Sequence, residues 1–344
     1  MNGSLRRRKI TSASVYVLLL ALLFLSCLIN AGCNGHAEEN ADGSPKADVP
    51  IGKYGYIDKN GETAIAFQYY LAFEFSEGLA RIQIASKEGY IDRTGTVVIE
   101  PKYWHAKPFS EGLASVVEGL DGRCGYINGQ GNYVVKPNYF GGNDFSEGLA
   151  RVKTVSGSAE DQTGFIDKNG DFVIDANLEA FEGSGLEKAD FHEGRALIAK
   201  KVILGEAVDF MYGFIDKKGA VVIEPQYEDA DHFSEGLAPV KKDGKWGYID
   251  TLGGMVIEPQ YEEAGIFSEG LAAVCLEGKW GYIDCAGKVA IEPRYEEAGI
   301  FSEGMAAVKI GGKWGYIDKN GNVVIEPQYA EAGYFSEGLA PVKY

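Results

Sequence analysis

The chain contains eight copies of one phrase between residue 54 and its C-terminus, and the most regular copy is KWGYIDKNGNVVIEPQYAEAGYFSEGLAPV at Lys313 to Val342. A glycine follows the leading aromatic residue, and in the last three copies it recurs every 34 residues, at Gly247, Gly281 and Gly315. A period of about 20 to 50 residues is typical of repeat proteins, because one unit cannot bury its apolar face alone and must pack on its neighbours. The sequence therefore predicts a scaffold or binding surface rather than an enzyme with a single cleft.

One unit consists of three short runs of β-forming residues, as in LAAVCLEGKWGYIDCAGKVAIEP at Leu271–Pro293. Glu277-Gly278 separates the first two runs, and a turn around Cys285 separates the second from the third. This pattern predicts a three-stranded antiparallel meander. The connecting FSEG segment contributes a phenylalanine that we expect at the seam between units and a glycine that allows a tight turn. No apolar period of 3.6 residues is sustained, so we predict an all-β fold.

The second turn of each unit has an aspartate and a glycine, as in DKNG at Asp167. The spacing of Asp167, Asn169 and Asp171 resembles the start of a calcium loop, but the glycine comes too early and no glutamate follows at the twelfth position. A hairpin turn, in which the aspartate accepts hydrogen bonds from the backbone two residues on, explains the pattern better.

The eight tandem units of about 34 residues can be arranged as a closed propeller-like ring or as an open β-solenoid. The repeats begin inside a unit, at Gly52, and end with GLAPVKY at Gly338–Tyr344, which is a first strand without its partners. In a ring this strand would complete the first unit and remove both sheet edges, whereas in a solenoid it would remain an exposed edge. Both arrangements fit the sequence.

The recurring KWGYID…G…VIEP…FSEGLA phrase closely resembles the WG-repeat (KWG-repeat) family of bacterial proteins, and the resemblance covers residues 51–344. The family implies a β-repeat domain that is often exported, and it implies no particular chemistry. The glycine beside the tryptophan, unfavourable within a strand, indicates that another backbone or a large ring lies against it. The positions that carry the phrase are Trp246, Gly247, Trp280, Gly281, Trp314 and Gly315. Five units depart from the tryptophan and have Tyr54, Glu88, Cys124, Thr163 and Tyr212 instead.

The N-terminal residues differ in composition from the repeats. Residues 1–32 have a basic start and a mostly apolar run, Val15–Ile29, that is too short to span a membrane, which predicts a secretory signal. The Ala-Gly-Cys sequence ending at Cys33 resembles a bacterial lipoprotein signal, so we expect Cys33 to be the lipid attachment site. Simple cleavage or an uncleaved anchor is the alternative. Residues 33–50 are polar and are predicted to be a disordered tether to the β domain, residues 51–344.

The cysteines and histidines indicate no catalytic or metal site. Cys275 and Cys285 are predicted to lie too far apart for a disulfide, so we expect these thiols and that of Cys124 to be free and packed as small hydrophobic side chains. The histidines show no metal-ligand spacing, and those at His192 and His232 are expected at a seam or on the surface. We therefore predict no enzymatic activity, no cofactor and no metal.

The net charge of −17 argues against nucleic acid or an anionic membrane surface as a partner. We expect an exported protein at the cell envelope, held at the membrane only through a lipid anchor, that presents a rigid acidic surface to a protein partner. The 20 tyrosines and 17 phenylalanines also allow an alternative, the binding of carbohydrate or cell-wall glycan. Insertions that interrupt the repeats are the preferred places for binding, namely Val155–Thr163, Asp175–Lys188 and Ala199–Tyr212.

Overall fold

The computed structural model describes residues 52–155, 161–174, 189–204 and 207–344, which all belong to one compact unit, Pro50–Tyr344. The predicted signal peptide, Cys33, the tether and the insertion at Asp175–Lys188 lie outside the described residues. Every regular element in the described ranges is a β-strand, so the all-β prediction is confirmed. No helix among the described residues has the length and hydropathy that crossing a membrane requires.

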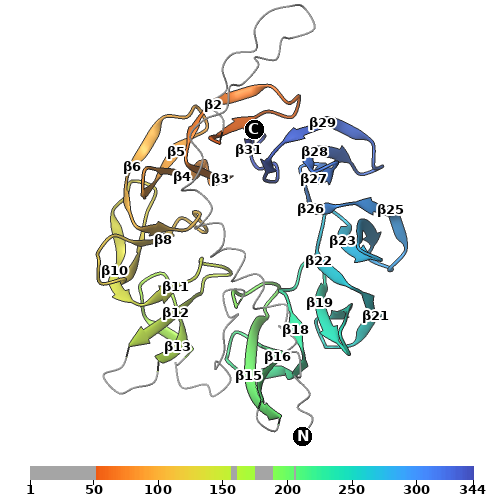
Figure 1. The fold of residues 1–344 in the computed structure, drawn as a ribbon. Coiled ribbons are helices and arrows are strands. Elements are labelled where there is room, and N and C mark those ends of the chain that lie inside the picture. The colour runs from red at the N-terminus through yellow and green to blue at the C-terminus, as the bar shows by residue number, and fades with distance from the viewer. Residues whose placement is uncertain (1–51, 156–160, 175–188, 205–206) are drawn as a thin grey trace, which may run out of the picture. The chain divides into compact units, whose positions relative to one another are not determined.

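The strands form eight small antiparallel sheets, the blades of a β-propeller (Figure 1), which we number by the order of their FSEG turns. Blade 1 consists of β3 (Leu71–Ser76), β4 (Leu79–Ile84), β5 (Lys87–Asp92) and β6 (Val97–Tyr103), and blade 2 of β7 (His105–Ala106), β8 (Ala114–Val117), β9 (Cys124–Ile127) and β10 (Tyr133–Tyr139). Blade 3 consists of β11 (Gly141–Gly142), β12 (Ala150–Val155), β13 (Asp161–Ile166) and β14 (Phe172–Ile174), and blade 4 of β15 (Ala196–Leu204), β16 (Ala207–Ile215) and β17 (Val221–Tyr227). Blade 5 consists of β18 (Asp229–Ala230), β19 (Leu237–Lys242), β20 (Lys245–Asp250) and β21 (Met255–Tyr261), and blade 6 of β22 (Glu263–Ser268), β23 (Leu271–Leu276), β24 (Lys279–Asp284) and β25 (Val289–Tyr295). Blade 7 consists of β26 (Glu297–Ser302), β27 (Met305–Ile310), β28 (Lys313–Asp318) and β29 (Val323–Tyr329), and blade 8 of β30 (Glu331–Ala332), β31 (Ala340–Lys343), β1 (Tyr54–Ile57) and β2 (Thr63–Tyr69).

Seven blades have a fourth strand in addition to the predicted meander. The segment between the EPxY corner and the FSEG turn supplies it, because its backbone pairs with the strand that follows, as Ala264 does with Val274. This added strand is the first of its blade and lies on the inner side of the ring, and the fourth strand lies at the periphery (Figure 1). In the described residues, blade 4 has three strands.

The ring closes because the two ends of the repeat domain share blade 8. The C-terminal strand β31 pairs with β1 in antiparallel register, with Tyr54 opposite Lys343 and Ile57 opposite Ala340. Across the same junction, the Ser336 hydroxyl donates a hydrogen bond of 2.6 Å to the Phe75 carbonyl. The closed ring is therefore confirmed, and the open solenoid is wrong. Closure leaves neither β1 nor β31 as an unpaired edge.

Each seam between blades buries one pair of aromatic rings. The FSEG phenylalanine of one blade packs against the tyrosine or phenylalanine at the centre of the third strand of the preceding blade, with ring centroids 4.8 to 5.1 Å apart. Where this residue is tyrosine, its buried hydroxyl also donates to a backbone carbonyl of the following blade, as from Tyr282 to Gly299 at 2.8 Å. The predicted seam position of these phenylalanines is confirmed. The pairs are Tyr56–Phe75, Tyr90–Phe109, Tyr126–Phe145, Phe165–Phe191, Phe214–Phe233, Tyr248–Phe267, Tyr282–Phe301 and Tyr316–Phe335.

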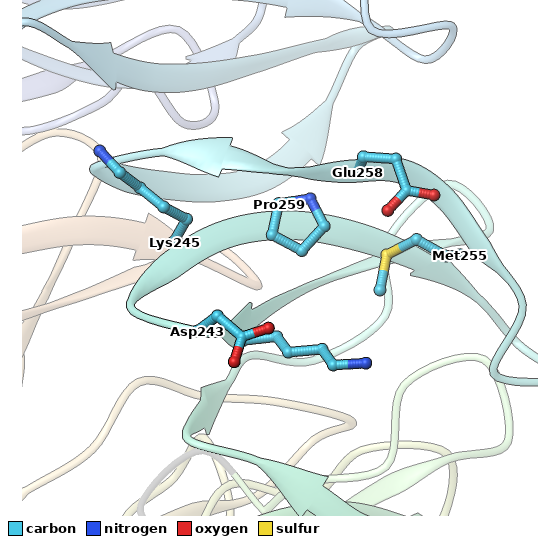
Figure 2. Close-up of a pocket in the computed structure, with 6 residues that line it drawn as sticks. Asp243, Lys245, Met255, Glu258 and Pro259 are labelled. Atoms are coloured by element: carbon cyan, nitrogen blue, oxygen red, sulfur yellow. The ribbon is translucent and has the colours of Figure 1, made fainter.

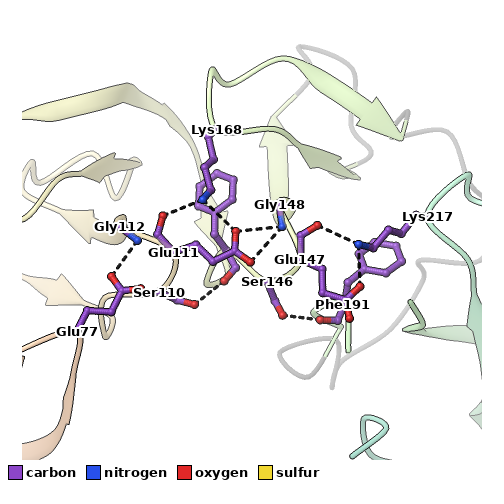
Figure 3. A network of polar contacts seen from close by, with 11 residues as sticks. Glu77, Ser110, Glu111, Gly112, Ser146, Glu147, Gly148, Lys168, Phe191 and Lys217 are labelled. Atoms are coloured by element: carbon purple, nitrogen blue, oxygen red, sulfur yellow. Dashed lines mark hydrogen bonds and ion pairs between the residues drawn. The ribbon is translucent and has the colours of Figure 1, made fainter. Parts of the chain in front are cut away.

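The FSEG glutamates link all eight blades through their side chains, and Figure 3 shows the bonds between Glu77 and Gly112 and between Glu111 and Gly148. Each carboxylate accepts the backbone N–H of the FSEG glycine in the next blade, as Glu77 does from Gly112 at 2.8 Å. The same bond crosses the closure, where Glu337 accepts from Gly78. The other six are Glu111 to Gly148, Glu147 to Gly194, Glu193 to Gly236, Glu235 to Gly270, Glu269 to Gly304 and Glu303 to Gly338.

These glutamates all adopt a left-handed backbone conformation, with φ between 52° and 55°. A residue other than glycine is unfavourable there by about 1 kcal/mol. The charge-assisted bond to the next blade offsets that cost. At four seams a lysine of the Asp-x-x-Gly turn adds an ion pair to the glutamate, in the pairs Lys59–Glu303, Lys168–Glu111, Lys217–Glu147 and Lys319–Glu269.

A parallel row of hydrogen bonds runs from each FSEG serine to the phenylalanine carbonyl of the next blade, as from Ser110 to Phe145 at 2.6 Å. Between blades 4 and 5 the serine is replaced by His192, and its ring stacks on His232 with centroids 4.0 Å apart. His232 in turn contacts the Asp231 carboxylate through Nδ1 at 2.8 Å. The expected seam position of the two histidines is confirmed, and their stacking replaces the missing hydrogen bond.

The glycine beside the tryptophan is required by the neighbouring strand. A Cβ atom on Gly281 would lie 2.6 Å from the Ile291 carbonyl oxygen and 2.7 Å from the Pro293 nitrogen, both in the fourth strand of the same blade. The strand register shifts at this point, which brings the two backbones together. The predicted close approach of another backbone is confirmed.

Replacing this glycine should therefore destabilise the ring. We expect Gly281→Ala to lower the free energy of unfolding by about 3 kcal/mol, because the added methyl group would clash with backbone atoms of the fourth strand, which cannot shift as easily as a flexible side chain. Gly299→Ala is the matched control, since its Cβ would meet ordinary contacts at 3.5 Å, and we expect a change within about 0.5 kcal/mol. Urea unfolding of both variants measures the difference, and equal stabilities would contradict the stated role of the glycine.

The histidine stack should make the seam between blades 4 and 5 sensitive to acid. Burial, then the neighbouring His232, lower the pKa of His192 from 6.5 to about 4, while Glu147 and Asp231 oppose that shift. The unfolded chain thus binds a proton near pH 6.5 that the folded chain accepts only near pH 4, so stability falls as the pH drops through this window.

The variant His192→Ser should lose this part of the acid sensitivity, because it restores the serine present in the other seven turns. Thermal melts of both proteins between about pH 7 and about pH 4 measure the difference. We expect a smaller decrease in melting temperature for the variant. An identical decrease would show that the stack does not control the response.

Candidate functional site

The sequence positions that carry the phrase have structural roles. Trp246, Trp280 and Trp314 lie near the start of the third strand, each opposite a tyrosine of the fourth strand. A lysine of the second strand lies over the ring in two of them, with Lys241 and Lys309 Nζ each 5.9 Å from the centroid. Gly247, Gly281 and Gly315 have the fourth strand against them. These residues build the blades.

Cys124, Cys275 and Cys285 are free, as predicted, and the Glu277-Gly278 hairpin sets Cys275 opposite Trp280. Cys124 and Cys275 are buried, but Cys285 is exposed because it lies in the turn between β24 and β25. The expectation that all three pack as small hydrophobic side chains is therefore wrong for Cys285. The described residues hold no group of three or more histidine, cysteine or acidic side chains that could bind a metal.

The Asp-x-x-Gly turn at Asp167 has the predicted hairpin form. Its Oδ1 accepts the backbone N–H groups of Asn169 at 2.9 Å and Asp171 at 3.0 Å. Hydrogen bonds from Asp171 and other turn residues lower the pKa of Asp167. The carboxylate is thus already used within the turn.

Glu88 shows how a charged residue replaces the tryptophan of the phrase. Its buried carboxylate forms an ion pair with Arg81 at 3.3 Å and accepts the Ala106 backbone N–H at 2.6 Å. The Arg81 guanidinium also lies 3.5 Å from the centroid of the Phe73 ring. A buried carboxylate needs such partners, since leaving it unpaired is strongly destabilising. This arrangement fixes Arg81 within blade 1.

Three carboxylates occur at the position just before the FSEG phenylalanine. They are Glu74 in blade 1, Asp144 in blade 3 and Asp190 in blade 4. The other blades have Pro108, His232, Ile266, Ile300 and Tyr334 at this position. We call Glu74, Asp144 and Asp190, with the nearby Arg81 and Lys107, the inner charged cluster. Its residues come from blades 1 to 4, and the equivalent positions of blades 6 and 7 are apolar.

Burial governs the ionisation of the inner charged cluster. It raises the pKa of Asp190 to about 6, a shift that a hydrogen bond from Asn143 opposes and the neighbouring Asp144 carboxylate increases. Burial also raises the pKa of Asp144, against the attraction of Lys107 and Arg81, and the pKa of Glu74, against backbone hydrogen bonds and Arg81. The cluster therefore favours an additional positive charge.

Hydrogen-bonding capacity in this cluster is incompletely used. The Oδ1 atoms of Asp144 and Asp190 are buried and accept no hydrogen bond from the described residues, and Nε of Arg81 donates none. Burial, followed by Glu74 and Asp144, raises the pKa of the Tyr334 hydroxyl to about 12, which places Tyr334 of blade 8 near these carboxylates. The Tyr334 side chain is 40% exposed, so the edge of the cluster reaches solvent.

A cavity of about 520 Å³ lies in blade 5 (Figure 2). It is lined by Lys242, Asp243, Lys245, Met255, Glu258 and Pro259. These residues balance two positive against two negative charges and include no histidine, cysteine or hydroxyl group.

The insertions expected to bind a partner are only partly described. The one at Ala199–Tyr212 extends the hairpin of β15 and β16, each of nine residues, beyond the length of the other blades. The one at Val155–Thr163 extends the β12–β13 hairpin on either side of residues outside the described ranges.

Comparison with solved structures gives distant likenesses. The chain is similar to a streptogramin B lyase (TM-score 0.40, 11% identity, 85% of this chain and 98% of that chain). It is also similar to virginiamycin B lyase from Staphylococcus aureus (TM-score 0.39, 12% identity, 84% and 98%) and to PorZ, a surface component of the type-IX secretion system of Porphyromonas gingivalis (TM-score 0.40, 13% identity, 70% and 36%). At this level of similarity, no functional conclusion transfers.

No curated protein matches the chain at a significant level. The family of the WG-containing repeat matches at residues 54–87, 89–119, 125–154, 212–246, 246–280, 280–314 and 314–344. These seven segments cover well over half of the chain, and each begins in the third strand of one blade and extends through the second strand of the next blade. The chain therefore belongs to the WG-containing repeat family.

Proposed function

We propose that this protein is a non-enzymatic binding module that acts as a protein-interaction scaffold at the cell envelope. The proposal includes export by the signal at residues 1–32 and anchoring through a lipid on Cys33. The observation that carries it is the inner charged cluster, in which Asp144 and Asp190 keep unused acceptor atoms within a ring held together at every seam. A rigid surface loses little conformational freedom on binding, which favours affinity.

The inner charged cluster favours a basic group of the partner. A lysine, arginine or N-terminal amine would donate to the free Oδ1 atoms and relieve the repulsion between Asp144 and Asp190. The net charge of −17 adds long-range attraction for a basic protein.

Neutralising the two aspartates tests this function. Mature protein and the double variant Asp144→Asn/Asp190→Asn would be used to capture proteins from envelope extract, with quantitative mass spectrometry as the measurement. We expect at least one basic protein to be recovered about tenfold less with the variant, equivalent to about 1.4 kcal/mol of lost binding.

Glu292→Gln/Glu326→Gln is the matched control, because both residues are exposed on the fourth strands of blades 6 and 7. It removes the same charge from the outer side of the ring and should retain the captured protein. Equal recovery with all three proteins at unchanged melting temperatures would contradict the proposal.

A further inference from the structure

The corner between one blade and the next has the same backbone geometry in seven places. The first residue after the fourth strand donates its N–H to a carbonyl in the second strand of the next blade, as Trp104 does to Val117 at 2.7 Å and Glu262 does to Cys275 at 2.9 Å. The corner residues are Tyr70, Trp104, Phe140, Glu228, Glu262, Glu296 and Ala330. Their side chains therefore start from equivalent places on the ring and can be compared directly.

In the corners that lead into blades 5, 6 and 7, the side chain is a glutamate with a structural task. Glu228, Glu262 and Glu296 accept the N–H of the glycine in the hairpin turn of the next blade, at distances of 2.9 to 3.2 Å. The glycines are Gly244, Gly278 and Gly312. These corners lie on the side of the ring that carries the hairpins between second and third strands.

In the corners that lead into blades 1, 2 and 3, the same position holds an exposed aromatic ring. Tyr70, Trp104 and Phe140 are 49%, 45% and 39% exposed. Because they are partly exposed, these rings bury only part of their apolar surface. They also cannot accept the N–H of the hairpin glycine as the glutamates do, because they lack a carboxylate. Three large rings repeated on consecutive blades form a row on the surface rather than a single exposed residue.

Each of these rings has a cation beside it. Lys53 Nζ lies 5.7 Å from the Tyr70 centroid, Lys87 Nζ lies 3.3 Å from the Trp104 centroid, and Arg123 Cζ lies 5.2 Å from the Phe140 centroid. All three cations come from the residue that precedes the Trp-type position of the third strand. Tyr70, Trp104 and Phe140 with these three cations are called the corner row below. The corner row carries these three positive charges in a chain of net charge −17, and one of them, Arg123, also forms an ion pair with the Asp121 carboxylate at 3.6 Å.

We propose that the corner row binds an anionic polysaccharide. The C–H face of a sugar ring is apolar and carries slightly positive hydrogens, so it would stack on the face of each aromatic ring that the cation does not cover. The adjacent cation would pair with a carboxylate or phosphate on the same polymer. A repeating polymer matches a repeating row, because three weak contacts on one chain combine into a higher apparent affinity. This goes beyond the proposed protein partner and uses different residues.

The polyuronate alginate is a suitable probe for the mature protein, with dextran as a neutral polysaccharide and poly-glutamate as an acidic peptide. Isothermal titration at low salt should show binding of alginate, weaker binding of dextran and no comparable binding of poly-glutamate. Added salt should reduce the alginate affinity, since exposed charges are screened. Absence of alginate binding would overturn the proposal. Poly-glutamate bound as tightly as alginate would also overturn it, in favour of an acidic protein partner.

Variants then locate the binding. Tyr70→Ala/Trp104→Ala/Phe140→Ala should weaken alginate binding by about tenfold or more, and Lys53→Gln/Lys87→Gln/Arg123→Gln should abolish the preference for alginate over dextran. Glu228→Gln/Glu262→Gln/Glu296→Gln changes the equivalent corners on other blades and should alter the affinity less than about threefold. Melting temperatures check that each variant is folded. Unchanged alginate binding by the folded ring variant would overturn the corner row as the site. Its failure would leave capture through Asp144 and Asp190 unaffected.

Discussion

The ring depends on one recurring contact, in which the FSEG glutamate of one blade accepts the backbone N–H of the FSEG glycine in the next blade. It occurs at every seam, including the one between Glu337 and Gly78 that joins the two ends of the domain. The glutamates reach it only from a left-handed backbone conformation. Because the turn geometry and the inter-blade bond require each other, each FSEG turn also fixes the position of the following blade. The buried aromatic pairs then fill the space between neighbouring sheets.

A frame held at every seam leaves other positions free to differ. The position before the FSEG phenylalanine is acidic in blades 1, 3 and 4 and apolar in blades 6 and 7. The corner position is aromatic before blades 1 to 3 and glutamate before blades 5 to 7. In both cases the backbone geometry is kept, and the changed side chain is one that could bind a partner. The functional asymmetry of this protein therefore lies in which residues interrupt the repeat pattern, and both interruptions fall within the N-terminal half of the ring.

Much of the fold follows from local sequence patterns. Glu277-Gly278 predicts the hairpin that sets Cys275 opposite Trp280, and the recurring glycine predicts the close approach of the fourth strand. The sequence does not predict the inner strand seen in seven of the described blades, because segments as short as Glu331–Ala332 carry no recognisable β-pattern. The sequence alone does not decide between a closed ring and an open solenoid, since the pairing of Tyr54 with Lys343 joins residues at opposite ends of the domain.

The candidate sites depend on comparison between units rather than on any one motif. Glu74, Asp144 and Asp190 stand out only when the units are superimposed at the FSEG phenylalanine, and their proximity follows from the ring. The same holds for Tyr70, Trp104 and Phe140, which look like ordinary aromatic residues along the chain. The sequence predicts the seam position only for the FSEG phenylalanines, and ring pairs such as Tyr248–Phe267 confirm it.

Amide hydrogen exchange on the native protein tests ring closure most directly. If β31 completes blade 8, the amides of β1 are held by the same kind of ladder as those of β24, which lies inside a continuous unit. Protection of Tyr56 and Ile57 should then match that of Tyr282 and Ile283 within a factor of about ten. Exchange of β1 and β31 at the rate of an unfolded peptide, with β24 protected, would contradict the closed ring.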